Sequence, residues 1–339
     1  MKDTEILFTK SGQPFVRTPE EYFDNLPDFN YSQNYIFING LRMHYIDEGP
    51  RNGEVILLLH GQPTWSYLYR KMIPILVAAG HRVIAPDHIG MGRSDKPTRI
   101  EDYTYHNHID WVEQFISKLN LKDITLFVQD WGSLIGLRIL GNNPDLFARL
   151  IVCNGLLPTI PEGFKPVQLP ETMEPDTEIT LPFDRENPNK YEWMEGFQKW
   201  VRYTLIGTRF RPSDLVNNVA TVVSLSIPEL HAYDAPFPSQ IYMSGVRAFP
   251  SLINTVGDIP TNEKAREVLD NFEKPTLTIF SERDPNMGSE ATQSLIKDRV
   301  KGAIGQPHHR YPDSAHFIQE DKGEDLARRI NEFIQLNPR

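Results

Sequence analysis

The segment that decides the fold of this chain is FVQDWGS, residues 127–133, where an apolar run passes directly into a helical one. The run Ile124 to Val128 is mostly apolar, as in a strand buried on both faces of a parallel sheet. Leu134 to Asn142 has the spacing of a helix. The residues between these two elements must form a tight turn with Asp130 at its apex. A simpler interpretation is that Asp130 only caps the following helix, as aspartate often does.

Strand-like and helix-like stretches alternate on both sides of this turn. Near the N-terminus, Asn39-Gly40 separates two strand-like runs and favours a two-residue hairpin turn. The expected strands are 35–38, 41–46, 55–59, 82–85, 124–128, 150–153 and 276–280, and the expected helices are 66–79, 110–119, 134–142, 193–205 and 324–336. The alternation predicts an α/β protein with a mostly parallel, doubly wound sheet.

The alternation stops in the middle of the chain. Residues 158–190 hold seven prolines and seven acidic residues against three basic ones, with little hydrophobic periodicity. We therefore expect a core domain formed by residues 1–155 and 236–339. A mainly helical cap subdomain at 156–235, which carries the Pro- and acid-rich insertion at 158–190, would interrupt it.

Composition limits the possible partners and the compartment. The 339 residues include 35 Lys and Arg against 45 Asp and Glu, a formal net charge of −10, which argues against nucleic acid and membrane surfaces as partners. The N-terminus lacks the blocks of a signal peptide, and the longest aliphatic run, Val55 to Leu59, is too short to span a bilayer. The single Cys153 rules out an internal disulfide framework. We expect a soluble, cytoplasmic protein.

A second chemically informative segment is HGQP, residues 60–63, directly after the expected strand 55–59. In an α/β hydrolase this position supplies a backbone N–H group to developing negative charge, and Gln62 is the candidate donor. The plain alternative is an ordinary strand-to-helix turn. No G-x-S-x-G occurs in the chain, which argues against a serine esterase.

A carboxylate and a histidine follow late in the chain, in the order that an α/β hydrolase requires. Asp284 comes shortly after the last expected strand, and His316 precedes the last expected helix. Glu282 is the rival of Asp284, and either could be a solvated loop acid. His308 and His309 also lie late, but they precede a turn and are expected on a strand or at the surface.

Tryptophan follows the apex aspartate directly, at Trp131. Indole has one N–H donor and no acceptor, so it could hold an anion at the mouth of a site. Core packing is the alternative for any tryptophan, and we prefer it for Trp65, Trp111 and Trp193. The pattern alone leaves Trp200 open.

Taken together, these motifs resemble the haloalkane dehalogenases, and within them the subfamily that draws its second halide-binding tryptophan from an early cap helix. The resemblance is carried by residues 60–70, 83–97, 128–132, 196–200 and 232–238 and by the surroundings of Asp284 and His316. It implies an α/β-hydrolase fold with a cap. The chain departs from the family in its long insertion and at Gln62, where well-known members of the subfamily have glutamate.

The resemblance also implies a role for each residue. Asp130 would be the nucleophile, His316 the base and Asp284 its carboxylate partner. The further implied sets are the oxyanion-hole N–H groups of Gln62 and Trp131, the halide-binding indoles of Trp131 and Trp200, and the pocket residues Phe197, Phe237, Pro238 and Phe317. The implied reaction converts a small haloalkane and water into a primary alcohol, a halide ion and a proton through an alkyl-aspartate ester. It uses no metal or other cofactor.

Two other functions compete with this interpretation. An epoxide hydrolase would use the same three residues together with cap tyrosines, for which Tyr191, Tyr203 and Tyr233 are available. Val128-Gln129 argues against it, because epoxide hydrolases resemble Gly-His at this point. A non-catalytic receptor on a hydrolase scaffold is the third possibility, although a binding protein has no need of the full set of catalytic residues. The sequence does not set the natural substrate or the oligomeric state.

Overall fold

The computed structural model describes residues 4–157, 166–183, 193–256 and 259–339, and an eight-stranded sheet forms its centre. The strand order is β11-β10-β9-β8-β5-β6-β4-β3, and the sheet is parallel except at β4, which runs antiparallel to both of its neighbours. The strands are β3 (Asn34–Ile38), β4 (Leu41–Glu48), β5 (Val55–Leu59), β6 (Arg82–Pro86), β8 (Ile124–Gln129), β9 (Phe147–Cys153), β10 (Thr276–Ser281) and β11 (His309–Tyr311). The mostly parallel sheet predicted from the sequence is confirmed.

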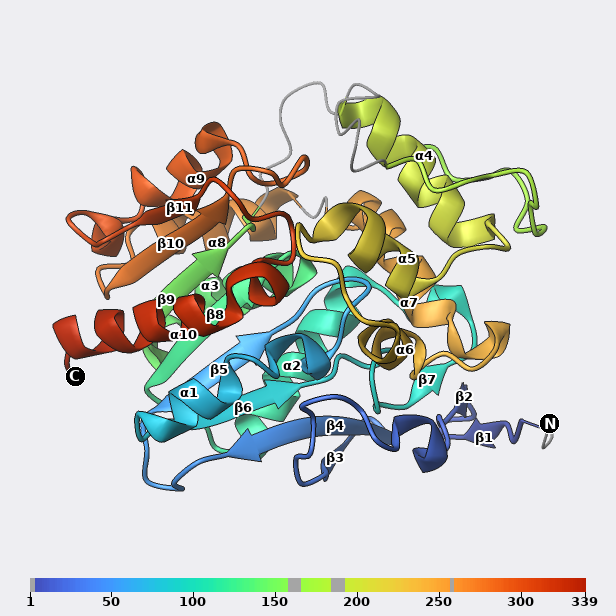
Figure 1. Ribbon diagram of the computed structural model, residues 1–339, viewed down its shortest axis with the longest axis horizontal. Helices are drawn as coiled ribbons and strands as arrows, with labels where there is room; N and C mark the ends of the chain where they lie inside the picture. The colour runs from blue at the N-terminus through green and yellow to red at the C-terminus, as the bar shows by residue number, and fades with distance from the viewer. Residues whose placement is uncertain (1–3, 158–165, 184–192, 257–258) are drawn as a thin grey trace.

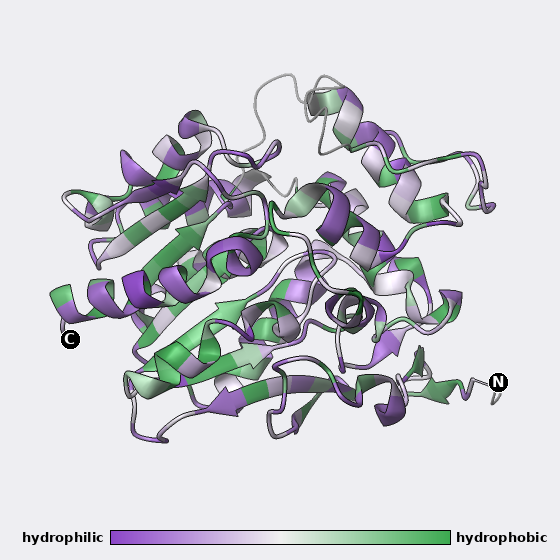
Figure 2. Ribbon diagram, viewed as in Figure 1, coloured by the Kyte–Doolittle hydropathy of each residue, from purple (hydrophilic) through white to green (hydrophobic). Residues whose placement is uncertain are grey.

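Helices cover both faces of this sheet (Figure 1). One face packs against α2 (Tyr105–Lys118), α3 (Trp131–Asn142) and α8 (Ile259–Asp270), and the other against α1 (Ile73–Ala78) and α10 (Ile318–Leu336), while α9 (Glu290–Lys297) follows β10. In β5, Leu57 and Leu59 join the first hydrophobic cluster, whereas Ile56 and Leu58 join the second. Successive side chains of a strand point to opposite faces, so a strand covered on both sides needs an unbroken apolar run. Figure 2 shows these central strands as mostly hydrophobic.

Local sequence explains the turn of the first hairpin and the residues at which α1 and α2 begin. Asn39 and Gly40 both have positive φ, 52° and 86°, as the predicted two-residue turn requires. The helix expected at 66–79 is divided into a 3₁₀ turn, η2 (Ser66–Tyr69), and α1, which begins with a proline in its first turn. α2 begins five residues earlier than expected, because the side chain of Thr104 accepts a hydrogen bond from Asn107 N and caps it.

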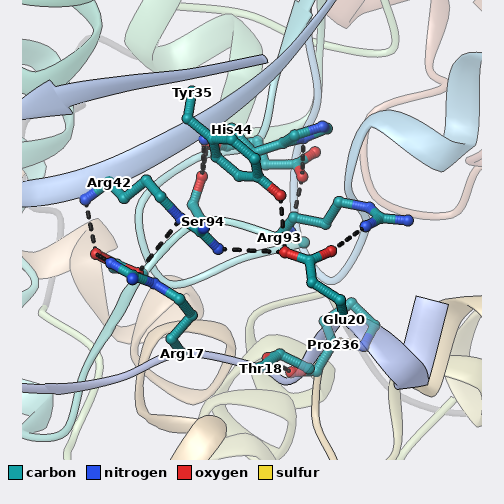
Figure 3. A network of polar contacts seen from close by, with 12 residues as sticks. Arg17, Thr18, Glu20, Tyr35, Arg42, His44, Arg93, Ser94 and Pro236 are labelled. Atoms are coloured by element: carbon teal, nitrogen blue, oxygen red, sulfur yellow. Dashed lines mark hydrogen bonds and ion pairs between the residues drawn. The ribbon is translucent and has the colours of Figure 1, made fainter. Parts of the chain in front are cut away.

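The N-terminal segment is fastened to the core by polar contacts that its weak periodicity does not reveal (Figure 3). Arg17 donates two hydrogen bonds to the buried carboxylate of Asp95, at 2.7 and 2.9 Å. Thr18 Oγ1 donates to the carbonyl of Pro236 at 2.7 Å, and Glu20 pairs with Arg93 at 2.5 Å. The segment also forms a small antiparallel sheet from β1 (Leu7–Phe8), β2 (Pro14–Val16) and β7 (Lys96–Pro97).

A group of helices lies beyond the carboxyl ends of β5, β8 and β9 (Figure 1). It comprises α4 (Trp193–Ile206), α5 (Pro212–Leu215), the π-helical turn η5 (Val216–Ala220), α6 (Ile227–Asp234) and α7 (Ser244–Ala248). The described part of the insertion, 166–183, has no helix, and its single bridge joins Asp176 to Gly207. The rest of the predicted insertion lies outside the described residues. Short 3₁₀ turns complete the chain at η1 (Glu20–Phe23), η3 (Ile100–Asp102), η4 (Pro144–Leu146), η6 (Gln240–Tyr242), η7 (Phe249–Asn254) and η8 (Lys301–Ala303).

None of the helices in the described ranges combines the length and the apolar character needed to cross a bilayer.

Candidate active site

Asp130 occupies the sharp turn between β8 and α3. Its φ of 52° and ψ of −130° are strained for a residue with a side chain. The backbone holds this conformation, since Asp130 N donates to Asn154 O at 3.1 Å and Ser133 N donates to Asp130 O at 2.8 Å. The side chain makes no capping hydrogen bond to α3. The simpler interpretation, in which Asp130 only caps the helix, is therefore wrong.

Two groups face the carboxylate of Asp130. The backbone N–H of Gln62 donates to Oδ1 at 2.7 Å, and His316 Nε2 lies 3.4 Å from Oδ2. The close approach depends on Gly61, because a Cβ there would lie 2.6 Å from Asp130 Cγ. The side-chain amide of Gln62 is engaged elsewhere and donates to Val246 O at 3.1 Å. The donor at this site is thus the backbone of Gln62, as expected.

Asp284, rather than Glu282, contacts the histidine. Asp284 Oδ2 lies 2.8 Å from His316 Nδ1, and its other oxygen accepts backbone hydrogen bonds from Asn286 and Met287. Glu282 is half exposed and lies 3.7 Å from Arg310 instead. The structure therefore brings Asp130, His316 and Asp284 together in the predicted order.

Electrostatics favour the charged form of His316 in the free protein. Burial lowers the pKa of its imidazole, but the carboxylates of Asp284 and Asp130 outweigh burial and raise that pKa to about 10. His308, the alternative histidine, bonds to Thr278 and to Ala303 O, away from these carboxylates.

Asn154, directly after β9, connects the segments that carry Asp130, Asp284 and His316. Its backbone carbonyl accepts from Asp130 N, and its side-chain oxygen accepts from Ser281 N at 2.8 Å. Its side-chain nitrogen donates to the carbonyls of Ala315 and His316 at 3.3 and 3.1 Å. Sequence reasoning missed this residue, although an asparagine at the end of an apolar strand is a visible signal.

A cavity of about 170 Å³ lies against Asp130 and His316. Both predicted indoles line it, and Trp131 and Trp200 are only 6% and 5% exposed. The remaining lining residues are Gln62, Leu134, Leu156, Phe183, Phe197, Leu215, Ala220, Ile253, Pro285, Asn286 and Met287. The cavity is thus largely apolar, with the carboxylate, the imidazole and two indole side chains at its wall.

Of the four residues predicted to line the pocket, the structure places one at this cavity. Phe197 lines the cavity, but Phe237 and Pro238 line a separate surface hollow beside Tyr22 and Gln240. Their segment follows α6, on the side of the molecule that the N-terminal segment covers. Phe317 is fully buried in the second hydrophobic cluster, where its ring contacts that of His316, and it does not line the cavity.

The other tryptophans lie where core packing was expected, as far as they are described. Trp65 and Trp111 are buried and belong to the two hydrophobic clusters. The side chain of Trp193 lies outside the description. Trp131 and Trp200 also belong to the first cluster, but they line the cavity as well.

Of the three tyrosines that an epoxide hydrolase could use, the two described ones, Tyr203 and Tyr233, do not line the cavity. Tyr203 donates to Arg209 O at 3.1 Å, and Tyr233 donates to the buried carboxylate of Glu320. Tyr191 lies outside the described residues. Within the described part of the chain, no group of three His, Cys, Asp or Glu side chains is arranged to hold a metal ion.

Comparisons with known proteins agree with this geometry. A family model of the α/β hydrolase fold matches residues 54–323. The haloalkane dehalogenase of Mycolicibacterium paratuberculosis is 47% identical over 328 residues, which cover 94% of this chain and 98% of the relative. That of Psychrobacter cryohalolentis is 41% identical over 333 residues, with 96% and 99% covered. The tetrameric structure of a haloalkane dehalogenase from Paraglaciecola agarilytica NO2 is similar with a TM-score of 0.77 and 34% identity, covering 93% of this chain and 96% of that one.

Proposed function

Since this chain belongs to the haloalkane dehalogenase family of α/β hydrolases, we propose that Asp130, His316 and Asp284 hydrolyse haloalkanes to a primary alcohol, halide and a proton. One observation carries this assignment. A carboxylate at a strained turn, with a backbone N–H on one oxygen and an imidazole near the other, faces an apolar cavity that two indoles line.

The first step is displacement of halide by the carboxylate of Asp130. The carboxylate is ionised at neutral pH without help from a base, and the apolar cavity removes competing water from it. Gln62 N–H holds Oδ1, which leaves Oδ2 as the oxygen that attacks carbon. The indole N–H groups of Trp131 and Trp200 receive the departing halide. Because they carry no charge, they stabilise the anion without trapping it.

The second step is hydrolysis of the alkyl ester on Asp130. His316 activates a water molecule that attacks the ester carbonyl carbon, and Asp284 holds the imidazole with its proton on Nδ1. The backbone N–H of Gln62 already bonds the oxygen that becomes the oxyanion. The backbone N–H of Trp131 is the second donor to this oxygen. The alcohol leaves and the carboxylate is restored.

The cap that the sequence predicts at 156–235 forms the roof of this cavity in our proposal. Phe183, Phe197, Trp200, Leu215 and Ala220 all come from this range and line the cavity. Core residues 1–155 and 236–339 supply the reacting groups. Substrate size would then depend mainly on cap side chains.

We also propose a cytoplasmic location. The one cysteine of the chain is buried and carries no disulfide.

The experiment that tests the function is intact-protein mass measurement after exposure to a 1-bromoalkane. The unmodified protein should release halide and return to its own mass. His316→Gln should gain the mass of one alkyl group, because ester formation proceeds and hydrolysis stops. Asp130→Asn is the matched control and should gain none. Absence of an adduct, together with no halide from the unmodified protein, would refute the proposal, and a diol formed from an epoxide would support the alternative enzyme.

A further inference from the structure

Gln129, the last residue of β8, directs its side chain at the catalytic histidine. It is fully buried. Its amide nitrogen lies 3.1 Å from His316 Nε2 and donates to His316 O at 3.2 Å. An amide nitrogen carries two hydrogens, so both donors are directed at one residue. Its oxygen, Oε1, is buried without a partner among the described residues, so the amide is held through its nitrogen alone.

A donor at Nε2 selects one protonation state of His316. Nδ1 donates its hydrogen to Asp284, so Nε2 can accept a hydrogen bond only when the imidazole is neutral. The carboxylate of Asp130, 3.4 Å from the same nitrogen, favours the opposite state, in which Nε2 carries a proton. Gln129 and Asp130 therefore compete for Nε2.

The remaining surroundings of the ring do not change this competition. The charged groups that face the imidazole are Asp130, after β8, and Asp284, after β10. The carboxylate of Asp321 on α10 accepts hydrogen bonds from the backbone N–H groups of Ala315, Val222 and Val223. The residues that share the cavity with His316 from the loop after β5, from the cap and from the loop after β10 are uncharged.

We propose that Gln129 is a positioning residue that holds His316 neutral, with its lone pair on Nε2, once Asp130 has become an ester. This inference rests on the proposed function. In the free enzyme the charge of Asp130 dominates and His316 is an imidazolium. Ester formation removes that charge, and the amide of Gln129 then decides the balance. The base becomes available only when there is an ester to hydrolyse.

The proton balance follows from this order. Haloalkane and the carboxylate give the ester and halide, and the imidazolium then releases its Nε2 proton to solvent. In hydrolysis, His316 takes one proton from water, the alcohol leaves, and the imidazolium and carboxylate are restored. One haloalkane and one water thus yield one alcohol, one halide and one proton. The proton that appears in solution leaves at the ester stage.

The first test needs no variant. Excess enzyme is mixed rapidly with a 1-bromoalkane in weak buffer near pH 8, and bromide, protons and alcohol are followed separately. We expect one proton per ester, released with bromide and before the alcohol. Protons that appear together with the alcohol would contradict the proposed order.

The second test compares Gln129→Glu and Gln129→Met. Glutamate replaces the donor by a carboxylate, so the apparent pKa of ester hydrolysis should rise by about one unit or more, which is about tenfold slower hydrolysis below that pKa. Methionine removes the donor without adding charge and should raise the apparent pKa by less. The rate of bromide release in a single turnover should fall much less than that of hydrolysis in both variants.

The matched control is Gln293→Glu, the same change at a buried glutamine that bonds to Thr278, away from His316. It should keep the pH profile of the unmodified enzyme. If both Gln129 variants keep that profile as well, or lose both steps in equal proportion, the role of Gln129 is refuted. If the unmodified enzyme releases no bromide, the proposed function itself fails.

Discussion

Trp200→Phe tests the proposed contribution of one indole N–H to halide binding. Trp200 packs against Phe183, Tyr203 and Phe210 with ring centroids 5.6, 6.0 and 5.7 Å away, contacts that a phenyl ring can largely retain. The stability loss should therefore stay below the roughly 3–5 kcal/mol of a truncation to alanine. A hydrogen bond to a charged group contributes about 1.5–3 kcal/mol. Loss of this hydrogen bond should weaken halide binding by about 10- to 150-fold.

The assay is quenching of tryptophan fluorescence by chloride or bromide, paired with the single-turnover rate of halide release from a bromoalkane. Trp111→Phe is the matched control, since Trp111 is equally buried but does not line the cavity. It should keep the halide affinity of the unmodified protein. A folded Trp200→Phe protein with unchanged affinity and rate would refute the assignment of Trp200 to the halide site.

Three further predictions concern the reacting groups. Asp284→Asn should leave ester formation in place but slow ester hydrolysis by about a hundredfold or more, because the imidazole loses the acceptor that fixes its tautomer. Rapid-quench measurement of the two steps checks this, and equal slowing of both would contradict it. Gly61→Ala should abolish the halide burst, since the added Cβ would overlap the carboxylate of Asp130, and a normal burst would show that the site does not need this close approach. The pKa of His316 is raised in the folded protein from 6.5 to about 10, so its stabilising ion pairs are fully present below pH 6.5 and are lost as the pH rises through about 10. The free energy of unfolding, measured by denaturant titration, should fall over that range relative to His316→Gln, and a parallel pH dependence of the two proteins would exclude the ion pairs as its source.

The meeting of Asp130, Asp284 and His316 could be predicted, because chain topology brings these three residues together. Each follows a strand of the parallel sheet, and the carboxyl ends of parallel strands meet at one edge. The apolar run before Asp130 and the helix after it require a turn at that residue, whatever the rest of the chain does. The position of Asp284 after β10 and of His316 before α10 follows in the same way.

The cavity wall could be predicted only in part, because it is built from helices and loops whose arrangement depends on tertiary packing. Phe237 is as apolar as Phe197, yet it lines a different hollow, on the side that the N-terminal segment covers. Nothing in the local sequence distinguishes the two. The N-terminal segment also could not be predicted. Its short strands show no hydrophobic periodicity, and no local pattern indicates the contact of Arg17 with Asp95.

The positions of Gln129 and Asn154 could be predicted only in part. Each is a polar residue at the end of an apolar strand. Burial of such a side chain costs free energy unless the side chain forms hydrogen bonds. The sequence therefore carries a signal that these residues have partners. It does not say that the partners belong to the loop of His316.

The central claim is that oxygen passes from Asp130 to the alcohol and is replaced from water. A single turnover in ¹⁸O-water, with enzyme in excess over a bromoalkane, tests this most directly by mass measurement of the alcohol and of the peptide that contains Asp130. The account predicts an unlabelled alcohol and one ¹⁸O atom in the carboxylate of Asp130. A labelled alcohol with an unlabelled Asp130 would mean that water attacks the haloalkane directly, and would contradict the account.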